Sequence, residues 1–305
     1  MSISRRIFVL PVSFFLVSAI APSRAQEPVK RPPITGVARV QISVTNVTAA
    51  RDFYEKTLRL PRDPSACNSE AAMCLAVNDH QQIQLVAALS PTPTNLIAAI
   101  VFATPDVAQM RRYLVSKGLT PDPISVDEHR VQHFGLRDPE GHTVSFLQQP
   151  ISSSSGRVAG QTSSRLIHAG FIVRDRLAED HFYQDILGFH LYWQGGMKDG
   201  ETSWVSMQVP DGTDWLEYML NISPDASHHT IGVMNHVALG VTDIRAVRGQ
   251  LLENGWKPAE EPKIGRDGKW QLNLYDPDDT RVEFMELKPV EKPCCSEFTG
   301  THPTL

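Results

Sequence analysis

The chain has 305 residues, of which 41% are hydrophobic and 21% charged, and its formal net charge is −5. This length is enough for about two domains, and the composition is typical of a soluble globular protein. It excludes a disordered chain, a fibrous rod and a multi-span membrane protein. Because 34 acidic residues outnumber 29 basic ones, and no basic stripe is visible, nucleic acid is not an expected partner.

Residues 1–25 are predicted to be an export signal peptide. Arg5 and Arg6 precede an apolar run over residues 7–21, which is shorter than the roughly 20 residues of a membrane-spanning helix. A small-x-small cleavage site follows at Ser23-Arg24-Ala25. Residues 4–10 resemble a twin-arginine signal, which exports folded proteins; a single N-terminal anchor is the alternative. The mature protein is therefore expected in the periplasm or outside the cell, with a formal charge of −8.

The four cysteines are expected to be structural. Export permits disulfides, and Cys67 with Cys74 is the plausible pair. Cys294 and Cys295 are neighbours in a proline-rich segment and are not expected to bridge to each other. No cysteine pair has the spacing of a zinc site with partners nearby, so no catalytic role is assigned to them.

A serine-rich linker over residues 150–164 divides the mature chain into halves at 34–149 and 165–289, and a loosely ordered tail is expected over 290–305. Each half contains the same pattern twice: an alternating strand, a polar cap, an amphipathic helix and several further strands. The opening strands are predicted at 39–45, 98–104, 168–174 and 236–242, with Asn46, Asp106, Asp175 and Asp243 as helix caps. The helices are expected to stop at Leu60-Pro61, Gly118, Gly188 and Asn254-Gly255.

The closing strands of two units also match. Residues 136–146 and 274–284 each contain a strand, an Asp-Pro turn and a second strand, which is typical of a hairpin. Each unit is therefore predicted to be βαβββ, and two adjacent units can curl their sheets into a cup. The predicted fold class is α+β.

The paired βαβββ units, the Asp-Pro-Asp hairpin and Val282-Glu283-Phe284 on the last strand resemble the vicinal oxygen chelate superfamily. That superfamily includes glyoxalase I, methylmalonyl-CoA epimerase, fosfomycin and bleomycin resistance proteins, and extradiol dioxygenases. The resemblance covers about residues 34–289 and implies two tandem glyoxalase-like domains with cup-shaped mixed sheets. It specifies the fold more strongly than the function, because the superfamily hosts several chemistries.

The resemblance implies a metal site in the second half. In the superfamily, ligands lie on the first and last strands of each unit, and the matching positions are His168, Glu217, His236 and Glu283. The two His-to-Glu separations are 49 and 47 residues, as expected for a duplication. Two imidazoles and two carboxylates suit one divalent ion such as Zn, Fe, Mn, Co or Ni. Taken singly, each histidine has an ordinary structural alternative, and Glu217 can equally face solvent.

The first half serves as an internal comparison. Alignment of the units places Arg39 at the position of His168, Gln84 at that of Glu217, Ala98 or Ala99 at that of His236, and Ser145 at that of Glu283. The fold is kept without the ligands, so the scaffold does not need them. The first domain is accordingly predicted to be a degenerate partner that lacks metal ligands.

Several other residues are weaker candidates for binding substrate or lining the site. Asn273 is a candidate for binding substrate, because it is predicted to lie on a strand of the same cup. His228 and His229 either line the mouth of the site or are ordinary loop residues. Trp204, Trp215 and Trp270 are expected in apolar walls or in the core.

Three functions remain open. The first is a glyoxalase- or epimerase-like lyase or isomerase, in which the metal holds two adjacent substrate oxygens and stabilises an enediolate while Glu283 or Glu217 moves the proton. The second is an extradiol dioxygenase, which uses two histidines and one glutamate around Fe(II); Glu217 is then an extra ligand, and Asn273 replaces the family's tyrosine. The third is a binding protein that sequesters a small molecule. In each case the partner is a small molecule, and a monomer is sufficient.

Overall fold

The structure is a computed structural model that describes residues 27–64, 67, 72–90, 95–127, 130–149 and 160–305. The predicted signal peptide and most of the predicted linker lie outside these residues. Among the described helices, none has the length and apolar character needed to span a membrane.

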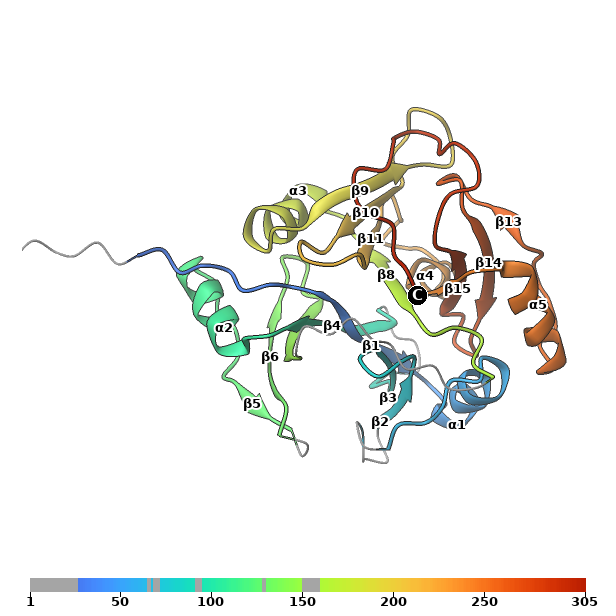
Figure 1. Cartoon of the computed structure of the whole chain (residues 1–305), viewed down its shortest axis with the longest axis horizontal. Helices are drawn as coiled ribbons and strands as arrows, with labels where there is room; N and C mark the ends of the chain where they lie inside the picture. The colour runs from blue at the N-terminus through green and yellow to red at the C-terminus, as the bar shows by residue number, and fades with distance from the viewer. Residues whose placement is uncertain (1–26, 65–66, 68–71, 91–94, 128–129, 150–159) are drawn as a thin grey trace, which may run out of the picture.

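The first domain is a curled, seven-stranded mixed sheet with its helices on one side (Figure 1). Its strand order is β2-β3-β1-β4-β7-β6-β5. The elements, in chain order, are β1 (Gly36–Val44), α1 (Val47–Arg51), the π-helical turn η1 (Asp52–Thr57), β2 (Ala72–Ala76), β3 (Gln82–Ala87), β4 (Ile97–Thr104), α2 (Val107–Ser116), β5 (Ser125–Val126), β6 (Gln132–Arg137) and β7 (Thr143–Gln148). In the first unit, one of the three expected closing strands is only an isolated bridge between Arg62 and Leu75.

The second domain repeats this plan in a sheet of eight strands. Its strand order is β13-β14-β15-β12-β8-β11-β10-β9. The elements are β8 (Leu166–Ile172), α3 (Arg176–Asp180), η2 (His181–Ile186), β9 (His190–Gly195), β10 (Trp204–Gln208), β11 (Trp215–Met219), α4 (His228–Met234), β12 (His236–Val241), α5 (Ile244–Glu253), β13 (Lys263–Ile264), β14 (Trp270–Tyr275) and β15 (Arg281–Glu286). The α+β prediction of two tandem domains built from paired units is confirmed.

All four predicted caps begin helices. The side chains of Asn46, Asp106, Asp175 and Asp243 each accept a hydrogen bond from a backbone N–H in the first turn, which satisfies a donor that has no partner within the helix. Beyond three of the helices, Gly118, Gly188 and Gly255 have φ values of 81–90°, a left-handed conformation that glycine adopts without penalty. The short α4, which contains His228 and His229, is a helix that the sequence did not indicate.

The two domains are interlocked by their Asp-Pro hairpins. The β14–β15 turn of the second domain reaches α1, where Asp278 accepts the backbone N–H of Thr45 at 2.9 Å. Conversely, the β6–β7 turn of the first domain reaches α3, where Glu140 accepts the N–H of Asp175 at 2.5 Å. The helical segments meet in the same exchanged way: Asn254, at the end of α5, donates to the carbonyl of Thr57 in η1 at 2.9 Å, and Tyr113 of α2 donates to the carbonyl of Ile186 in η2 at 2.6 Å. The halves are therefore two domains in sequence but one packed unit in space.

The described end of the predicted linker is part of this packing. Gln161, Thr162, Ser163 and Ser164 are all buried. Thr162 donates its hydroxyl to the carbonyl of Leu58 in the first domain at 2.6 Å, and Ser163 donates to the carbonyl of Gly240 in the second at 2.8 Å. These residues consequently join the two domains rather than separate them.

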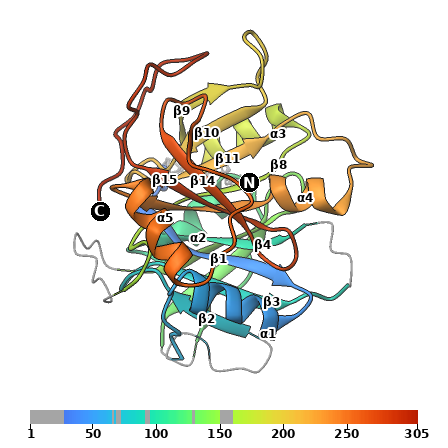
Figure 2. The same ribbon diagram turned by 90° about the vertical axis from the view of Figure 1, so that its right-hand side faces the viewer.

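The expectation of a loosely ordered tail is wrong. After β15 the chain turns back along the outside of β9 (Figure 2), where the N–H of Thr299 donates to the carbonyl of Tyr192 at 3.0 Å. The hydroxyl of Tyr192 also contacts Nδ1 of His302 at 2.5 Å, and the Phe298 ring lies 4.8 Å from that of Tyr192. Residues 290–305 thus cover part of the second domain.

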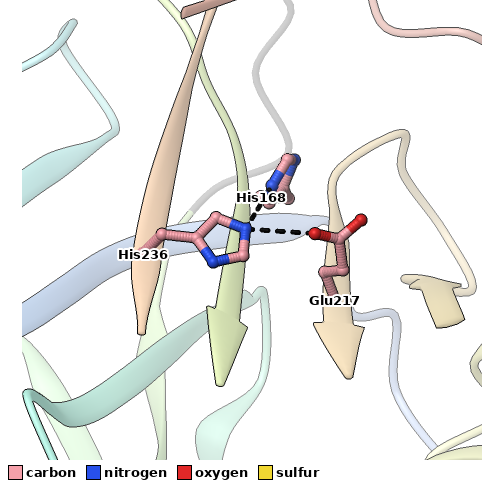
Figure 3. A group of neighbouring side chains, drawn as sticks. All are labelled: His168, Glu217 and His236. Carbon is pink, nitrogen blue, oxygen red and sulfur yellow. Dashed lines mark hydrogen bonds and ion pairs between the residues drawn. The ribbon is translucent and has the colours of Figure 1, made fainter. Parts of the chain in front are cut away.

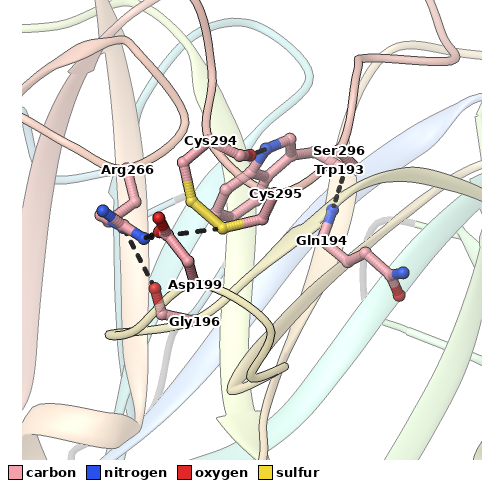
Figure 4. The surroundings of a disulfide bond; sticks show 8 residues. All are labelled: Trp193, Gln194, Gly196, Asp199, Arg266, Cys294, Cys295 and Ser296. Atoms are coloured by element: carbon pink, nitrogen blue, oxygen red, sulfur yellow. Dashed lines mark hydrogen bonds and ion pairs between the residues drawn. A yellow bond between two sulfur atoms is a disulfide. The ribbon is translucent and has the colours of Figure 1, made fainter.

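The disulfides follow one expectation and contradict the other. Cys67 and Cys74 are paired as predicted. Cys294 and Cys295 are also joined (Figure 4), which corrects the view that they do not bridge. The chain turns sharply at this point because Cys295 has a φ of 76°, and Trp193 donates its indole N–H to the carbonyl of Cys294 at 3.2 Å.

Candidate metal centre

The four predicted ligand positions lie on four consecutive strands of one sheet. Glu283, His236, His168 and Glu217 come from β15, β12, β8 and β11, which are neighbours in that order. Parallel pairing joins β12 to β15 and β8 to β11, whereas β8 and β12 run antiparallel. The duplication therefore places the pairs His168–Glu217 and His236–Glu283 on opposite sides of the boundary between β8 and β12.

The tips of these side chains converge. Nε2 of His168 lies 3.0 Å from Nε2 of His236, which lies 3.1 Å from Oε2 of Glu217 (Figure 3). Oε2 of Glu283 lies 3.5 Å from Nε2 of His168 and 4.0 Å from that of His236. The possible ligand atoms of His168, Glu217 and His236 are all within 4.8 Å of one another.

The donor set has the electrostatics of a cation site. Nδ1 of His236 lies 3.2 Å from the carbonyl of Met234; donation to that oxygen leaves Nε2 with a free lone pair. Burial and the charge of Arg281 lower the pKa of His236 to about 4, so its imidazole is neutral. Burial raises the pKa of Glu217, but in the state in which Nε2 of His236 carries a proton and donates to it, this hydrogen bond and nearby positive charges outweigh burial and lower that pKa to about 2; a bound cation would take the place of that proton. Lone pairs and a carboxylate charge thus face one point, an arrangement that a divalent cation satisfies.

Gly170 makes room for this cluster, and the sequence analysis missed it. It is the cross-strand partner of His236, and a Cβ at this position would lie 1.8 Å from Cε1 of the imidazole. An isolated glycine inside a strand is the signal that marks such a close approach. In the first domain the corresponding pair is Gln41 with Ala99. There the large side chain lies on the strand that matches β8, and the small one on the strand that matches β12.

A cavity of about 80 Å³ opens beside the carboxylates. Its lining consists of Trp193, Trp204, Glu217, Arg266, Asp267, Gln271, Arg281, Glu283 and Met285. Arg281 faces the same side of β15 as Glu283, and its Nε is buried without a hydrogen-bond partner among the described residues. A larger hollow of about 530 Å³ near Glu55 and Asn254 contains no such cluster of donors.

Of the other predicted site residues, Asn273 is next to a candidate ligand and Trp204 lines the cavity, whereas His228 and His229 do neither. Asn273 is the cross-strand partner of Glu283, but its amide donates to Glu260 at 3.2 Å and it does not line the cavity. His229 is exposed and pairs with Asp279 at 3.1 Å, and neither it nor His228 lines the cavity. Trp204 is a wall of the cavity, as expected.

Trp215 links the centre to a buried lysine. Its ring packs on that of His168 with centroids 4.7 Å apart. On its other side the ammonium of Lys269 lies 4.7 Å from Trp215, 5.0 Å from Tyr192 and 4.9 Å from Phe298. Three aromatic faces around one ammonium compensate part of its lost hydration. Because Phe298 is one of them, the tail helps to hold Lys269 and Trp215, which packs on His168, in place.

The register of the first sheet confirms the internal comparison. Arg39 pairs with Gln82 where His168 pairs with Trp215, so Arg39 and Gln84 occupy the places of His168 and Glu217. The corresponding partner on β4 is Ala99 rather than Ala98. Gln84 instead accepts a hydrogen bond from Gln41 at 2.8 Å, so amides replace the donor set of the second domain.

A family model described as the Glyoxalase/Bleomycin resistance protein/Dioxygenase superfamily matches residues 36–146 and 165–284. These segments cover most of the chain and coincide with the two domains. The chain belongs to this superfamily. A search of curated proteins finds no match to this chain.

Solved structures with the same fold include extradiol dioxygenases. Homoprotocatechuate 2,3-dioxygenase from Brevibacterium fuscum, in an anaerobic complex with 3,4-dihydroxyphenylacetate, has a TM-score of 0.61 and 20% identity, covering 88% of this chain and 86% of that one. The homoprotocatechuate 2,3-dioxygenase of Arthrobacter globiformis has a TM-score of 0.62 and 18% identity, with coverages of 88% and 85%. At these identities the likeness establishes the shared fold of the superfamily and not the reaction.

Proposed function

We propose that this protein is a metal-dependent enzyme of the glyoxalase and epimerase type, a lyase or isomerase that acts on a small substrate with two adjacent oxygen atoms. The observation that carries the proposal is the convergence of His168, His236, Glu217 and Glu283, whose nearest polar atoms lie 3.0–4.0 Å apart, at the edge of a small cavity. We further propose that residues 1–25 direct the protein out of the cytoplasm.

The four side chains would hold one divalent ion, with zinc, iron, manganese, cobalt and nickel all compatible with the donor set. When bound, such an ion polarises the substrate oxygens and stabilises negative charge that develops on them. His168 and His236 are buried and fixed by packing, so their role is to hold. Both carboxylates line the cavity, but Glu283 is farther from the imidazoles than Glu217 is.

Glu283 is therefore the better candidate for the carboxylate that takes the proton from the substrate carbon and returns it, and Glu217 is the alternative. Arg281, on the same face as Glu283, supplies a fixed positive charge beside the substrate. The apolar side chains of Trp193, Trp204 and Met285 exclude water from this side of the cavity, which strengthens each of these electrostatic interactions.

Substitution of Glu283 by Gln tests the proposal. The change keeps the shape of the side chain but removes its basicity, so it should reduce turnover by about 10²-fold or more while most of the metal is retained. Metal content by elemental analysis and turnover of a panel of 2-oxoaldehyde thiol adducts and epimerisable thioesters provide the two readouts. His168→Ala should lose the ion held by the cup and the activity together. An active Glu283→Gln variant would assign the proton transfer to Glu217 instead.

A second candidate is an extradiol-type dioxygenase, because the architecture matches those enzymes over most of both chains. The extra carboxylate Glu217 and the amide Asn273, where those enzymes have a tyrosine, count against it. Oxygen consumption by the iron-loaded protein with 3,4-dihydroxyphenylacetate or catechol would reverse the ranking. The third possibility, a sequestering protein, predicts that the cup of the purified mature protein holds no transition metal, so that His168→Ala leaves the metal content unchanged.

A further inference from the structure

A second cluster of possible metal ligands lies behind the sheet, where the two domains meet. It consists of Asp138 and His142 from the β6–β7 hairpin of the first domain and Glu179 from α3 of the second. Their possible ligand atoms lie within 4.8 Å of one another. Phe171, against which the His142 ring packs at 4.7 Å, points from β8 to the side opposite His168, so the cluster is separate from the cup.

One oxygen of this cluster has no partner. Glu179 is completely buried; its Oε1 accepts the N–H of Glu140 at 3.1 Å, but its Oε2 has no hydrogen bond. Asp138 is also buried, and its Oδ2 contacts Nδ1 of His142 at 2.8 Å. A buried carboxylate oxygen without a donor is costly, so two carboxylates and one imidazole here require a neutralising species.

The opposite junction shows that the hairpin does not need this cluster. There Asp276 takes the place of Asp138: both accept two backbone N–H groups of their own turn, and both accept a tyrosine hydroxyl from the other domain, Tyr54 or Tyr183. The positions of His142 and Glu179 are occupied by Thr280 and Ala50. Since the interlock forms there with neither side chain, His142 and Glu179 are additions to it.

The surroundings favour a cation over an anion. Glu140 and Asp175 also lie near Glu179 and act on it electrostatically. The nearest arginine on the helix, Arg176, is engaged with Asp180 and Gln194. The mixed nitrogen and oxygen donors fit zinc or a similar first-row ion better than calcium, which takes oxygen ligands alone.

We propose that Asp138, His142 and Glu179 bind a second divalent transition-metal ion, a structural ion that ties the β6–β7 hairpin of the first domain to α3 of the second. It replaces the proton between Asp138 and His142 and supplies the missing partner of Glu179. This proposal does not depend on the function assigned to the cup, because the two sites share no residue.

The test is the zinc content of the full-length mature protein, dialysed against zinc and then against buffer. The wild type should hold two zinc ions per chain, Glu179→Gln and His142→Ala one each, and the double variant His168→Ala/Glu179→Gln none. Thr280→Ala, at the matching position of the other junction, should keep two. Zinc should raise the melting temperature of His168→Ala but not that of the double variant, and anomalous scattering should place zinc between the three side chains.

Two results would overturn the proposal. The first is a zinc content that is the same in the wild type, Glu179→Gln and His142→Ala. The second is a single zinc that only His168→Ala removes, in which case a proton neutralises Glu179 and the cup remains the metal site. A single zinc that Glu179→Gln removes and His168→Ala keeps would support the junction site and count against the proposed function instead.

Discussion

At the scale of single residues, Gly170 decides whether His236 reaches the donor cluster. A methyl group at this position would overlap the imidazole, so Gly170→Ala should displace His236 and lower the metal occupancy of the cup by tenfold or more while the sheet still forms. Elemental analysis with circular dichroism checks both parts. The matched control is Gly249→Ala on α5, where a Cβ meets nothing within 4 Å and a small gain in stability is expected. Full occupancy in Gly170→Ala would show that the ring has room to move.

Arg281 is a second single-residue determinant. Its charge lowers the pKa of Glu217, Glu283 and His236, and it also repels a cation held by them. Arg281→Met should therefore bind zinc more tightly, by roughly tenfold, while losing activity towards a substrate that carries negative charge. Competition with a chromophoric chelator measures the affinity, and Arg245→Met on α5 is the control. Weaker zinc binding by Arg281→Met would mean that the arginine supports the ligand geometry instead.

At the scale of elements, the β14–β15 hairpin introduces a dependence of stability on pH. Burial, together with the charge of Asp278, raises the pKa of Asp276 to about 7, although backbone hydrogen bonds oppose the shift. The folded state therefore binds a proton between pH 4 and 7 that the unfolded state has released, so this carboxyl favours folding below about pH 4 and loses up to about 4 kcal/mol of that contribution as pH rises through 7.

Asp276→Asn mimics the protonated form and should flatten this dependence. Urea unfolding at pH 5 and pH 7.5 gives the free energies, and Asp279→Asn, at a half-buried position of the same turn, should show the same pH dependence as the wild type. If Asp276→Asn and the wild type lose equal stability between the two pH values, Asp276 is already ionised at pH 5.

At the scale of the whole molecule, residues 290–305 support the metal centre indirectly, through residues that pack behind His168. Phe298 packs against the ammonium of Lys269, and His302 contacts the hydroxyl of Tyr192. Lys269 and Tyr192 in turn contact Trp215, whose ring packs on His168. Deletion of residues 290–305 should reduce the free energy of unfolding by about 2–4 kcal/mol and weaken metal binding. Removal of only the exposed Thr304 and Leu305 is the control for denaturant titrations. Unchanged stability in the long deletion would show that the tail is dispensable.

Much of the fold follows from local rules that the sequence displays. The caps Asn46, Asp106, Asp175 and Asp243 and the two Asp-Pro hairpins depend only on neighbours in the chain, so spacing and residue type were sufficient to predict them. The four candidate ligand positions came from the resemblance to the vicinal oxygen chelate superfamily, and the matching separations in the two units and the alternation of strand residues agree with it. The residues at the matching positions of the first domain could also be assigned from the sequence, except for the choice between Ala98 and Ala99, which needed the register.

The sequence by itself determined the units, their caps and the types of side chain that gather in one cup. Only the tertiary structure decided which partners lie across space: the room that Gly170 leaves for His236, the arginine beside the carboxylates, the tail around Lys269 and the Asp138–His142–Glu179 cluster. These contacts join residues far apart along the chain, and their energies depend on burial and on distances of a few ångströms, which a pattern of neighbouring residues does not encode.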